Sequence, residues 1–151
     1  MSGDGLSEIL LGAPRTETNP DPNALSCGDS TRLECEGELY VLSGPPSAYG
    51  TDYAIDNVSE LTLKGAVGDY FAWQFTTGDF DGDSAVDLVA TSPGYVSNSG
   101  NSLEGALYFF SDFGSDLTGL SGSQNATDLA DSVVYGDDNE GQLGTTMIAI
   151  G

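Results

Sequence analysis

The chain contains no histidine, three lysines and arginines in total, and two cysteines. The absence of histidine removes the commonest general base and one of the usual zinc ligands. The 24 acidic residues give a net charge of -21 at pH 7, so nucleic acid and anionic membrane surfaces are electrostatically unfavourable partners. No run approaches the roughly 20 apolar residues of a membrane-spanning helix. The composition therefore predicts no nucleic acid partner and no membrane span, and favours cations as ligands.

The two cysteines, Cys27 and Cys35, flank the short polar loop CGDSTRLEC. Because no histidine or third cysteine can complete a zinc site, a local disulfide is the favoured interpretation, with two unpaired thiols as the alternative. A disulfide is typical of an oxidising compartment and predicts an extracellular or cell-surface location. The acidity fits either a calcium-rich exterior or a salt-rich habitat. We expect no enzymatic activity, although carboxylate pairs of the glycosidase kind stay open as an alternative.

Short runs rich in β-branched and aromatic residues recur along the chain, and glycine-containing turns separate them. No window carries a helical hydrophobic period over the ten or more residues that a helix needs. The sequence therefore predicts an all-β fold.

One acidic loop has the spacing of a metal site. In DFDGDSAVD, residues 79–87, side-chain carboxylates stand at loop positions 1, 3, 5 and 9 and a backbone carbonyl at position 7: Asp79, Asp81, Asp83, Asp87 and, for the carbonyl, Ala85. Calcium takes six to eight hard oxygen ligands in flexible geometry, and Gly82 allows a tight turn. An EF-hand would need glutamate at position 12, where this chain has Ala90, and helices on both sides. The alternative is a solvated loop without an ion.

The chain also repeats itself. SGDGLSEILLGAP, ending at Pro14, aligns with DGDSAVDLVATSP, ending at Pro93, and GDYFAWQFTTG parallels EGQLGTTMIAIG. The pattern then runs in a fixed order: a strand, an Asp-x-Asp-x-Asp loop, a second strand and a G-x-x-Y-x-F-like run. This pattern resembles the FG-GAP repeat of integrin α-subunit propellers. The FG position reads Phe71-Ala72 and Leu143-Gly144, and the GAP position reads Gly12-Ala13-Pro14 and Thr91-Ser92-Pro93.

The resemblance implies β-propeller blades of four antiparallel strands. Residues 70–136 would form a complete blade with strands at 70–78, 86–92, 105–110 and 132–136. Residues 1–69 would supply three strands of a preceding blade, at 6–13, 37–42 and 61–65, with an insertion over 15–36. Residues 137–151 would supply the first strand of a following blade, at 143–150. Two blades' worth of strands predicts either an excised part of a longer propeller or self-assembly through open blade edges.

The resemblance implies that the 79–87 loop binds calcium. Ser84 stands where the family usually has glycine. It also implies a partial second metal loop in which Ser2, Asp4, the Leu6 carbonyl and Glu8 match positions 3, 5, 7 and 9. Position 1 of that loop would precede Met1. We expect a half-loop to bind calcium poorly unless neighbouring chains rebuild it.

Integrin propellers receive ligands on the face opposite the calcium loops, and the 15–36 insertion would lie on that face. It carries Arg15 and Arg32, two of the three basic residues, and is the candidate ligand loop, with a plain spacer as the alternative. The partner would be a protein or a glycan. The sequence thus predicts an extracellular calcium-binding propeller segment that acts in adhesion, ligand binding or subunit assembly, with calcium in a structural role. The alternative function is an accessory propeller of a secreted polysaccharide-active enzyme.

Overall fold

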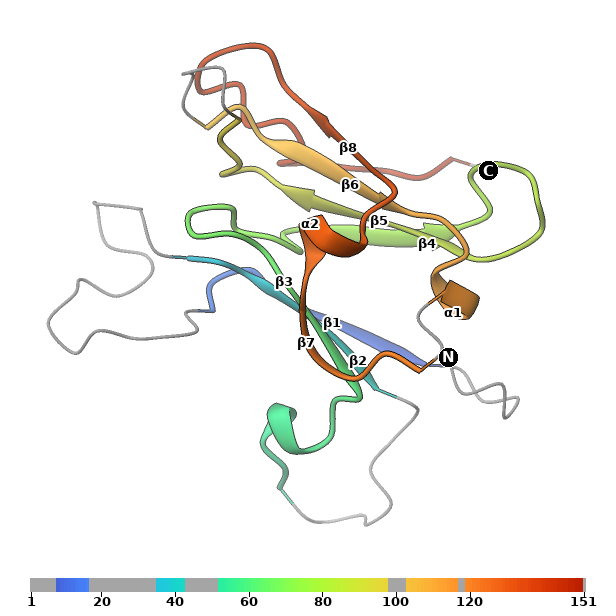
Figure 1. The fold of residues 1–151 in the computed structure, drawn as a ribbon. Coiled ribbons are helices and arrows are strands. Elements are labelled where there is room, and N and C mark those ends of the chain that lie inside the picture. The colour runs from blue at the N-terminus through green and yellow to red at the C-terminus, as the bar shows by residue number, and fades with distance from the viewer. Residues whose placement is uncertain (1–7, 17–34, 43–51, 98–102, 117–118, 151) are drawn as a thin grey trace, which may run out of the picture.

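The computed structural model describes residues 8–16, 35–42, 52–97, 103–116 and 119–150, and these residues form two four-stranded sheets (Figure 1). The remaining secondary structure is limited to single turns: η1 (Ile55–Asn57), α1 (Phe113–Asp116) and α2 (Ala126–Leu129). The all-β prediction is confirmed. No helix of the described residues is long and apolar enough to cross a membrane.

The second sheet is the complete blade that the sequence predicts. Its strands lie in the order β4 (Phe75–Gly78), β5 (Asp87–Ser92), β6 (Ala106–Phe110) and β8 (Ser132–Tyr135), and all neighbours are antiparallel. The innermost strand begins at Phe75 rather than at residue 70. Tyr70 (φ 55°) and Ala72 (φ 58°) adopt left-handed conformations, which interrupt an extended strand.

The first sheet contains the three strands expected before that blade: β1 (Ile9–Ala13), β2 (Glu38–Leu42) and β3 (Leu61–Lys64). Its fourth strand was not predicted. β7 (Gly122–Asn125) comes from the connection between β6 and β8 of the other sheet and lies parallel to β3, with Leu61 opposite Gly122. The chain therefore crosses from the second sheet to the first and back, which interlocks the two sheets.

The strand predicted over 143–150 does not form. Leu143 makes one parallel bridge with Gly105, and the residues after it belong to no strand. Ile148 and Ile150 are 83% and 91% exposed. A β-strand needs a neighbour to hydrogen-bond with, and no described strand pairs with this segment.

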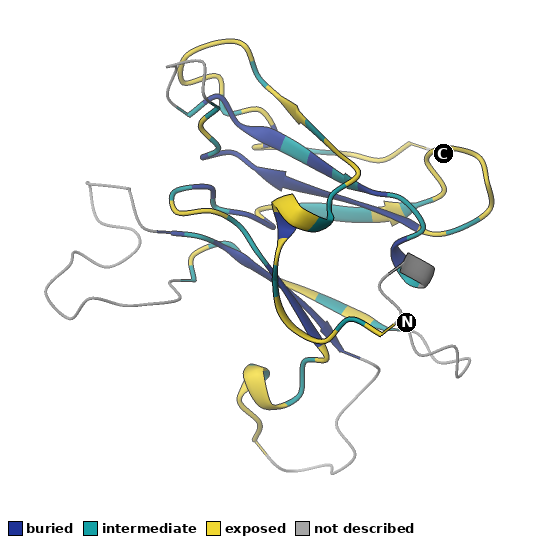
Figure 2. Ribbon diagram, viewed as in Figure 1, coloured by how far each residue is buried: buried dark blue, intermediate teal, exposed yellow. Residues whose placement is uncertain are grey.

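One hydrophobic core serves both sheets. Figure 2 shows buried residues concentrated in the strands that face the space between the sheets. The cluster includes Leu39, Val41, Leu61 and Leu63 from the first sheet and Leu88, Ala90, Tyr108 and Phe110 from the second. Phe71, in the connection between the sheets, is fully buried and meets Tyr108 edge to face with ring centroids 5.3 Å apart. The two sheets therefore form one folding unit.

Candidate metal centre and pocket

The acidic loop 79–87 connects β4 to β5 and forms the turn of a β-hairpin at one end of the second sheet (Figure 1). Two residues of the loop have positive φ angles, Gly82 at 89° and Ser84 at 74°. Glycine adopts this conformation without steric cost, whereas serine does so under strain. The loop thus keeps the tight turn that the sequence predicts, with a strained residue at the position of the departure from the family pattern.

Three carboxylates converge in this loop. One oxygen each of Asp79, Asp81 and Asp87 lies within 4.8 Å of the others, with the first two side chains exposed and Asp87 only 5% exposed. Carboxylate oxygens are the hard donors that calcium takes, and the residues present therefore fit that ion. The fourth predicted ligand, Asp83, lies outside this group, and its Oδ1 accepts a hydrogen bond from the Ala85 N–H at 2.7 Å.

Backbone N–H groups hold the exposed carboxylates in place. Asp79 accepts hydrogen bonds from Gly82 N at 2.7 Å and Ser84 N at 3.1 Å, one on each carboxylate oxygen. Asp81 Oδ1 accepts from Asp83 N at 3.1 Å. These bonds wrap the loop backbone around the carboxylates and orient them before any ion arrives.

Asp87 has a second role. Its Oδ2 accepts a hydrogen bond from Phe80 N at 2.6 Å, across the hairpin, and its Oδ1 accepts from Asp112 N at 3.0 Å, after β6. The first residue of β5 therefore ties the acidic loop to the connection that follows β6. Sequence spacing marks Asp87 as a ligand but carries no signal for its contact with Asp112, which is distant in the chain.

The partial second loop falls mostly outside the described residues. Ser2, Asp4 and Leu6 are among the residues that the structure does not describe, and Glu8 is described directly before β1. The second metal loop accordingly stays a prediction.

The order of strand, acidic loop and two further strands can now be compared with known families. The family model of the FG-GAP repeat matches residues 71–110. These residues are an FG-GAP repeat. The repeat covers Phe71, β4, the acidic loop, β5 and β6, so Asp79, Asp81 and Asp87 all lie inside it. No curated protein matches the chain closely enough to identify a relative.

The FG-GAP match indicates the β-propeller as the architecture, and the second sheet is the blade to which the repeat belongs. The matched segment ends at the end of β6, and β8 completes the sheet beyond it. Outside the match, the first sheet has the same strand order in β1, β2 and β3 as the second sheet has in β5, β6 and β8.

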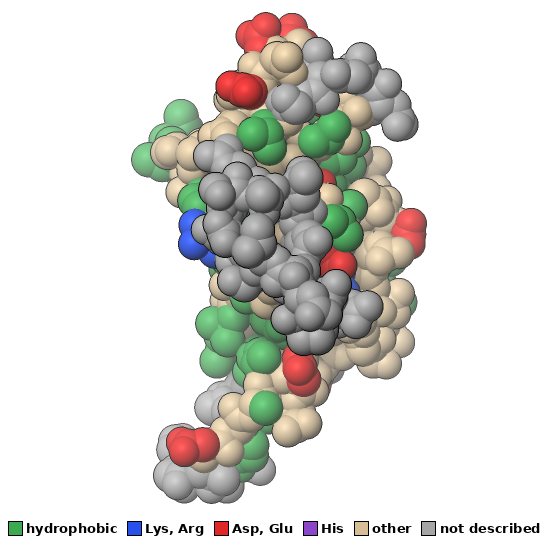
Figure 3. All heavy atoms as spheres, turned by 90° about the vertical axis from the view of Figure 1, so that its left-hand side faces the viewer, with side chains coloured by type: hydrophobic (Ala, Val, Ile, Leu, Met, Phe, Trp, Pro, Cys, Tyr) green, Lys and Arg blue, Asp and Glu red, His purple; other side chains and the backbone are tan. Residues whose placement is uncertain are grey.

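A pocket of about 190 Å³ lies at the opposite end of β4 and β5 from the acidic loop. The loops that follow β1 and β5 line it together with the segments that follow β3 and β8, and its lining residues are Arg15, Tyr70, Trp73, Pro93, Gly94, Leu103, Gln142 and Thr145. Figure 3 faces this end of the molecule and shows a basic side chain at the edge of the face with apolar side chains around it. The candidate ligand residue Arg15 therefore lines a hollow on the side predicted for ligand binding.

Residues 17–34 of the candidate ligand loop lie outside the described residues, and they include Arg32 and Cys27. Cys35 is described and fully buried. The disulfide between the two cysteines stays a prediction.

Two aromatic residues, Tyr70 and Trp73, line the pocket. Alternation of Phe71, Trp73 and Phe75 along an expected strand favours packing between blades, with a carbohydrate site as the alternative. The core cluster includes Phe71 and has Phe75 packed against it, but Trp73 is 38% exposed, with its ring edge to face with Tyr70 at 6.4 Å. The left-handed turn at Ala72 breaks the alternation. Ala72 stands at the glycine of the FG position, and that position is the sequence signal for such a turn.

Proposed function

We propose that this chain is a segment of an extracellular β-propeller that acts in adhesion, ligand binding or subunit assembly, with calcium in a structural role. The observation that carries the proposal is the convergence of three aspartate carboxylates within 4.8 Å inside an FG-GAP repeat. Consecutive copies of this repeat build propellers, and the described fold supplies blade strands on both sides of the loop.

Calcium would act on the hairpin between β4 and β5. Asp79, Asp81 and Asp87 would hold the ion, and the repeat spacing adds Asp83 and the Ala85 carbonyl as ligands. Like charges at about 5 Å repel one another by about 1 kcal/mol per pair in bulk water and by several times more near a protein surface. A bound cation converts this repulsion into attraction. Because Asp87 also bonds to the segment after β6, an ion at this site would fix the loop to three strands of the blade.

The pocket at the other end of the blade is the candidate ligand site. Arg15 makes no salt bridge with any residue that the structure describes, and Tyr70 and Trp73 place aromatic rings beside it. A guanidinium group binds carboxylates, and aromatic faces stack on sugar rings and on apolar side chains. These features support an acidic glycan or a carboxylate-bearing protein segment as the ligand.

The same aromatic lining favours a second candidate function, an accessory glycan-binding propeller of a secreted polysaccharide-active enzyme. Trp73 presents an exposed indole ring at the pocket, as sugar-binding surfaces do. Turnover of a polysaccharide by the parent protein, with binding lost in Trp73→Ala, would favour this candidate over adhesion.

A calorimetric titration with calcium, paired with thermal melting, tests the proposed role of the acidic loop. We expect one site per chain and a melting temperature that rises with calcium concentration, because an ion that binds only the folded state stabilises it. Asp81→Asn removes one exposed carboxylate of the cluster and should weaken calcium binding at least about tenfold, or about 1.4 kcal/mol.

Asp138→Asn is the matched control. It removes the same charge from an exposed loop that is outside the cluster and should leave calcium affinity unchanged. Absence of calcium heat, together with equal melting temperatures in calcium and in chelator, would contradict the proposal.

A further inference from the structure

The chain contains two Asn-x-Ser/Thr triplets, Asn57-Val58-Ser59 and Asn125-Ala126-Thr127. Such a triplet, with any residue except proline in the middle, is the acceptor of asparagine-linked glycosylation. Triplets of this kind also arise often by chance, so the sequence alone does not distinguish a modified asparagine from an unmodified one. The structural settings of the two asparagines do distinguish them.

Both triplets lie in matching parts of the repeat. The single turn η1 stands in the connection between β2 and β3, and the single turn α2 stands in the connection between β6 and β8. The residues directly before the two turns have the same extended backbone, Ala54 with φ -71° and ψ 137° and Asn125 with φ -76° and ψ 133°. Asn125 thus precedes its turn, whereas Asn57 is the third residue of its turn and matches Asp128.

Asn125 is held in place by the fold. It is the last residue of β7, where it pairs with Lys64 of β3, and its Nδ2 donates a hydrogen bond to Asp128 Oδ2 at 2.8 Å. The next residue, Ala126, is fully buried in the core that the two sheets share. To enter the active site of a glycosyltransferase, this triplet would have to leave the β7 pairing and withdraw Ala126 from the core, which requires the fold to open.

Asn57 has no such contacts among the residues that the structure describes. Its side chain is exposed and makes no hydrogen bond with any described residue, and no residue of η1 is buried. The backbone bonds of the turn are local: Asn57 N donates to Ala54 O at 3.0 Å, and Val58 N and Ser59 N donate to Ile55 O at 3.0 and 2.9 Å. Opening this turn therefore breaks short-range hydrogen bonds and no core contact, and Figure 2 shows the turn exposed beyond the end of the first sheet.

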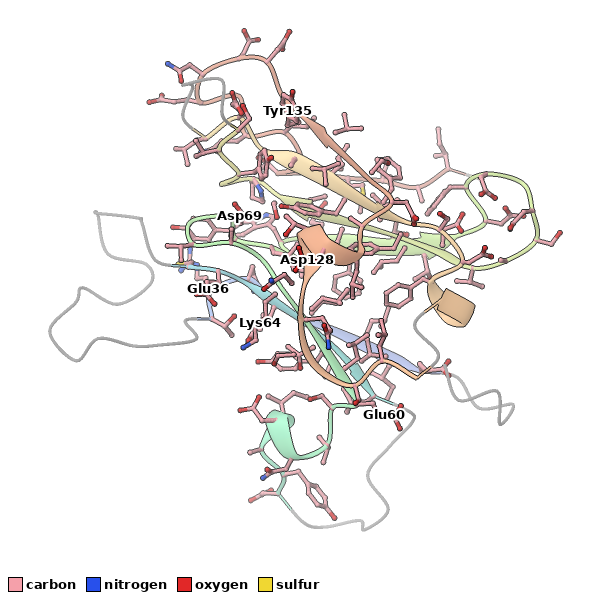
Figure 4. All side chains as sticks on the ribbon, in the orientation of Figure 1. Glu36, Glu60, Lys64, Asp69, Asp128 and Tyr135 are labelled. Atoms are coloured by element: carbon pink, nitrogen blue, oxygen red, sulfur yellow. The ribbon has the colours of Figure 1, made fainter. Side chains whose placement is uncertain are left out.

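The exposure of Asn57 does not depend on what packs against the outer face of the first sheet. Asp128, at the matching position, is exposed although Ala126 of the same turn is part of the core between the two sheets (Figure 4). A further sheet packed against η1 in the same way would therefore leave Asn57 at the surface.

We propose that Asn57 is the attachment site of an asparagine-linked glycan on the folded chain and that Asn125 is not. This inference rests on the extracellular location in the proposed function, because such glycans are carried by exported proteins. The donor is an oligosaccharide linked to a lipid pyrophosphate. The Asn57 Nδ2 attacks C1 of its first sugar, so that the C1–N bond forms, the C1–O bond to the pyrophosphate breaks, and a base of the transferase takes the amide proton. No atom is oxidised or reduced.

Glycan transfer to the purified, folded 151-residue chain tests the proposal. The chain is incubated with a single-subunit oligosaccharyltransferase and a lipid-linked oligosaccharide, and peptide mass spectrometry then identifies the modified asparagine. We expect a glycan on Asn57 that is lost in Asn57→Gln and in Ser59→Ala, because the triplet needs both the amide and the hydroxyl. Ser59→Thr retains a hydroxyl and should retain the glycan. Asn125→Gln is the matched control and should be modified as the unchanged chain is.

Circular dichroism checks that each variant is folded before transfer. Ser59 Oγ lies 3.4 Å from Thr62 Oγ1, so if Ser59→Ala does not fold, the comparison of Asn57→Gln with Asn125→Gln decides. An unmodified Asn57, or modification of Asn125 to the same extent as Asn57, would overturn the proposal. Because the assay supplies both the enzyme and the donor, its outcome depends neither on calcium nor on where the protein is located. Failure of glycan transfer is therefore distinguishable from failure of the calcium titration.

Discussion

The two sheets of this molecule are built from the same repeat but differ in where their four strands come from. The second sheet takes all four strands from residues 75–135 and pairs them antiparallel. The first sheet has three strands of its own and receives its fourth, β7, from the other repeat in parallel orientation. The outer edge of β3 is therefore covered by the following repeat, through the connection between the last two strands of that repeat.

Strands at matching positions of the two repeats differ in how deeply they are buried. Every residue of β5 is buried, whereas β1, its counterpart with a similar apolar sequence, has three exposed residues among five. The difference lies in their neighbours, since β5 has a strand on each edge and β1 has one among the residues that the structure describes. Burial in this repeat is thus set by the presence of adjacent strands more than by the hydrophobicity of the strand itself.

The largest expected effect tests whether the two sheets form one unit. Leu63 of the first sheet and Leu88 of the second are both fully buried in the shared cluster. Leu63→Ala and Leu88→Ala should each lower the free energy of unfolding by about 2–5 kcal/mol, because each leaves a cavity in the same core. Urea denaturation followed by Trp73 fluorescence and by far-ultraviolet circular dichroism should give one coincident transition for both variants.

Tyr53→Ala is the control for this pair, since Tyr53 is 41% exposed and its truncation should change stability by less than about 0.5 kcal/mol in the monomer. Two separate transitions, with one sheet retained in either leucine variant, would show that the sheets fold independently.

Asp69 lies in the segment between β3 and β4 that connects the two sheets (Figure 4). We expect it to make the stability of the fold depend on pH. The side chain is 4% exposed, and its Oδ2 accepts hydrogen bonds from Ala66 N and the Tyr108 hydroxyl, both at 3.1 Å. Burial raises the pKa of this carboxyl from 3.8 to about 6, against the lowering effect of those two bonds. The folded state thus holds the proton more tightly than the unfolded state.

Because the folded pKa is the higher one, the contribution of Asp69 to stability is fully present below about pH 4 and is lost as the pH rises to about 6 and beyond. Asp69→Asn keeps an acceptor for the Tyr108 hydroxyl but cannot ionise. It should raise the free energy of unfolding at pH 7 by up to about 3 kcal/mol and change it little at pH 4. Melting curves at both pH values check this. Asp138→Asn should show no such dependence, and an Asp69→Asn variant less stable than the unchanged chain at pH 7 would contradict the assignment.

Much of this fold could be predicted because most strands of the repeat are marked by their own local sequence. Alternating apolar runs and turn glycines place seven of the eight strands near their observed positions, and the Asp-x-Asp-x-Asp spacing places the acidic hairpin between β4 and β5. β7 could not be predicted in this way. Its sequence, GSQN, has no strand-forming composition, and it is extended because the open edge of β3 hydrogen-bonds to it.

The candidate site likewise has contacts that the loop spacing predicts and contacts that it does not. Loop spacing brings Asp79, Asp81 and Asp87 together, since residues two apart in a tight turn project into one space. The contact of Asp87 with Asp112 and the exposure of Trp73 depend instead on how distant segments meet. The segment 143–150 has a strand-forming sequence, but no described strand pairs with it, so its sequence alone could not make it a strand.

The smallest expected effect concerns the hairpin loops of the two repeats. The first repeat has Gly5 at the loop position where the second has Ser84, and Ser84 has a φ of 74° that strains a residue with a side chain. Ser84→Gly should relieve this strain but enlarge the conformational freedom of the unfolded chain, for a net stabilisation of about 0.5–1 kcal/mol.

Ser132→Gly in β8 is the matched control, because the same change in an extended strand should destabilise by about 0.5–1 kcal/mol. The opposite signs of the two variants, measured by urea denaturation in chelator, would separate backbone strain from a general effect of glycine. A second measurement in calcium sharpens the comparison further: if the turn at Ser84 limits how closely the loop closes on an ion, Ser84→Gly gains more stability in calcium than in chelator, whereas equal gains would confine its effect to the backbone.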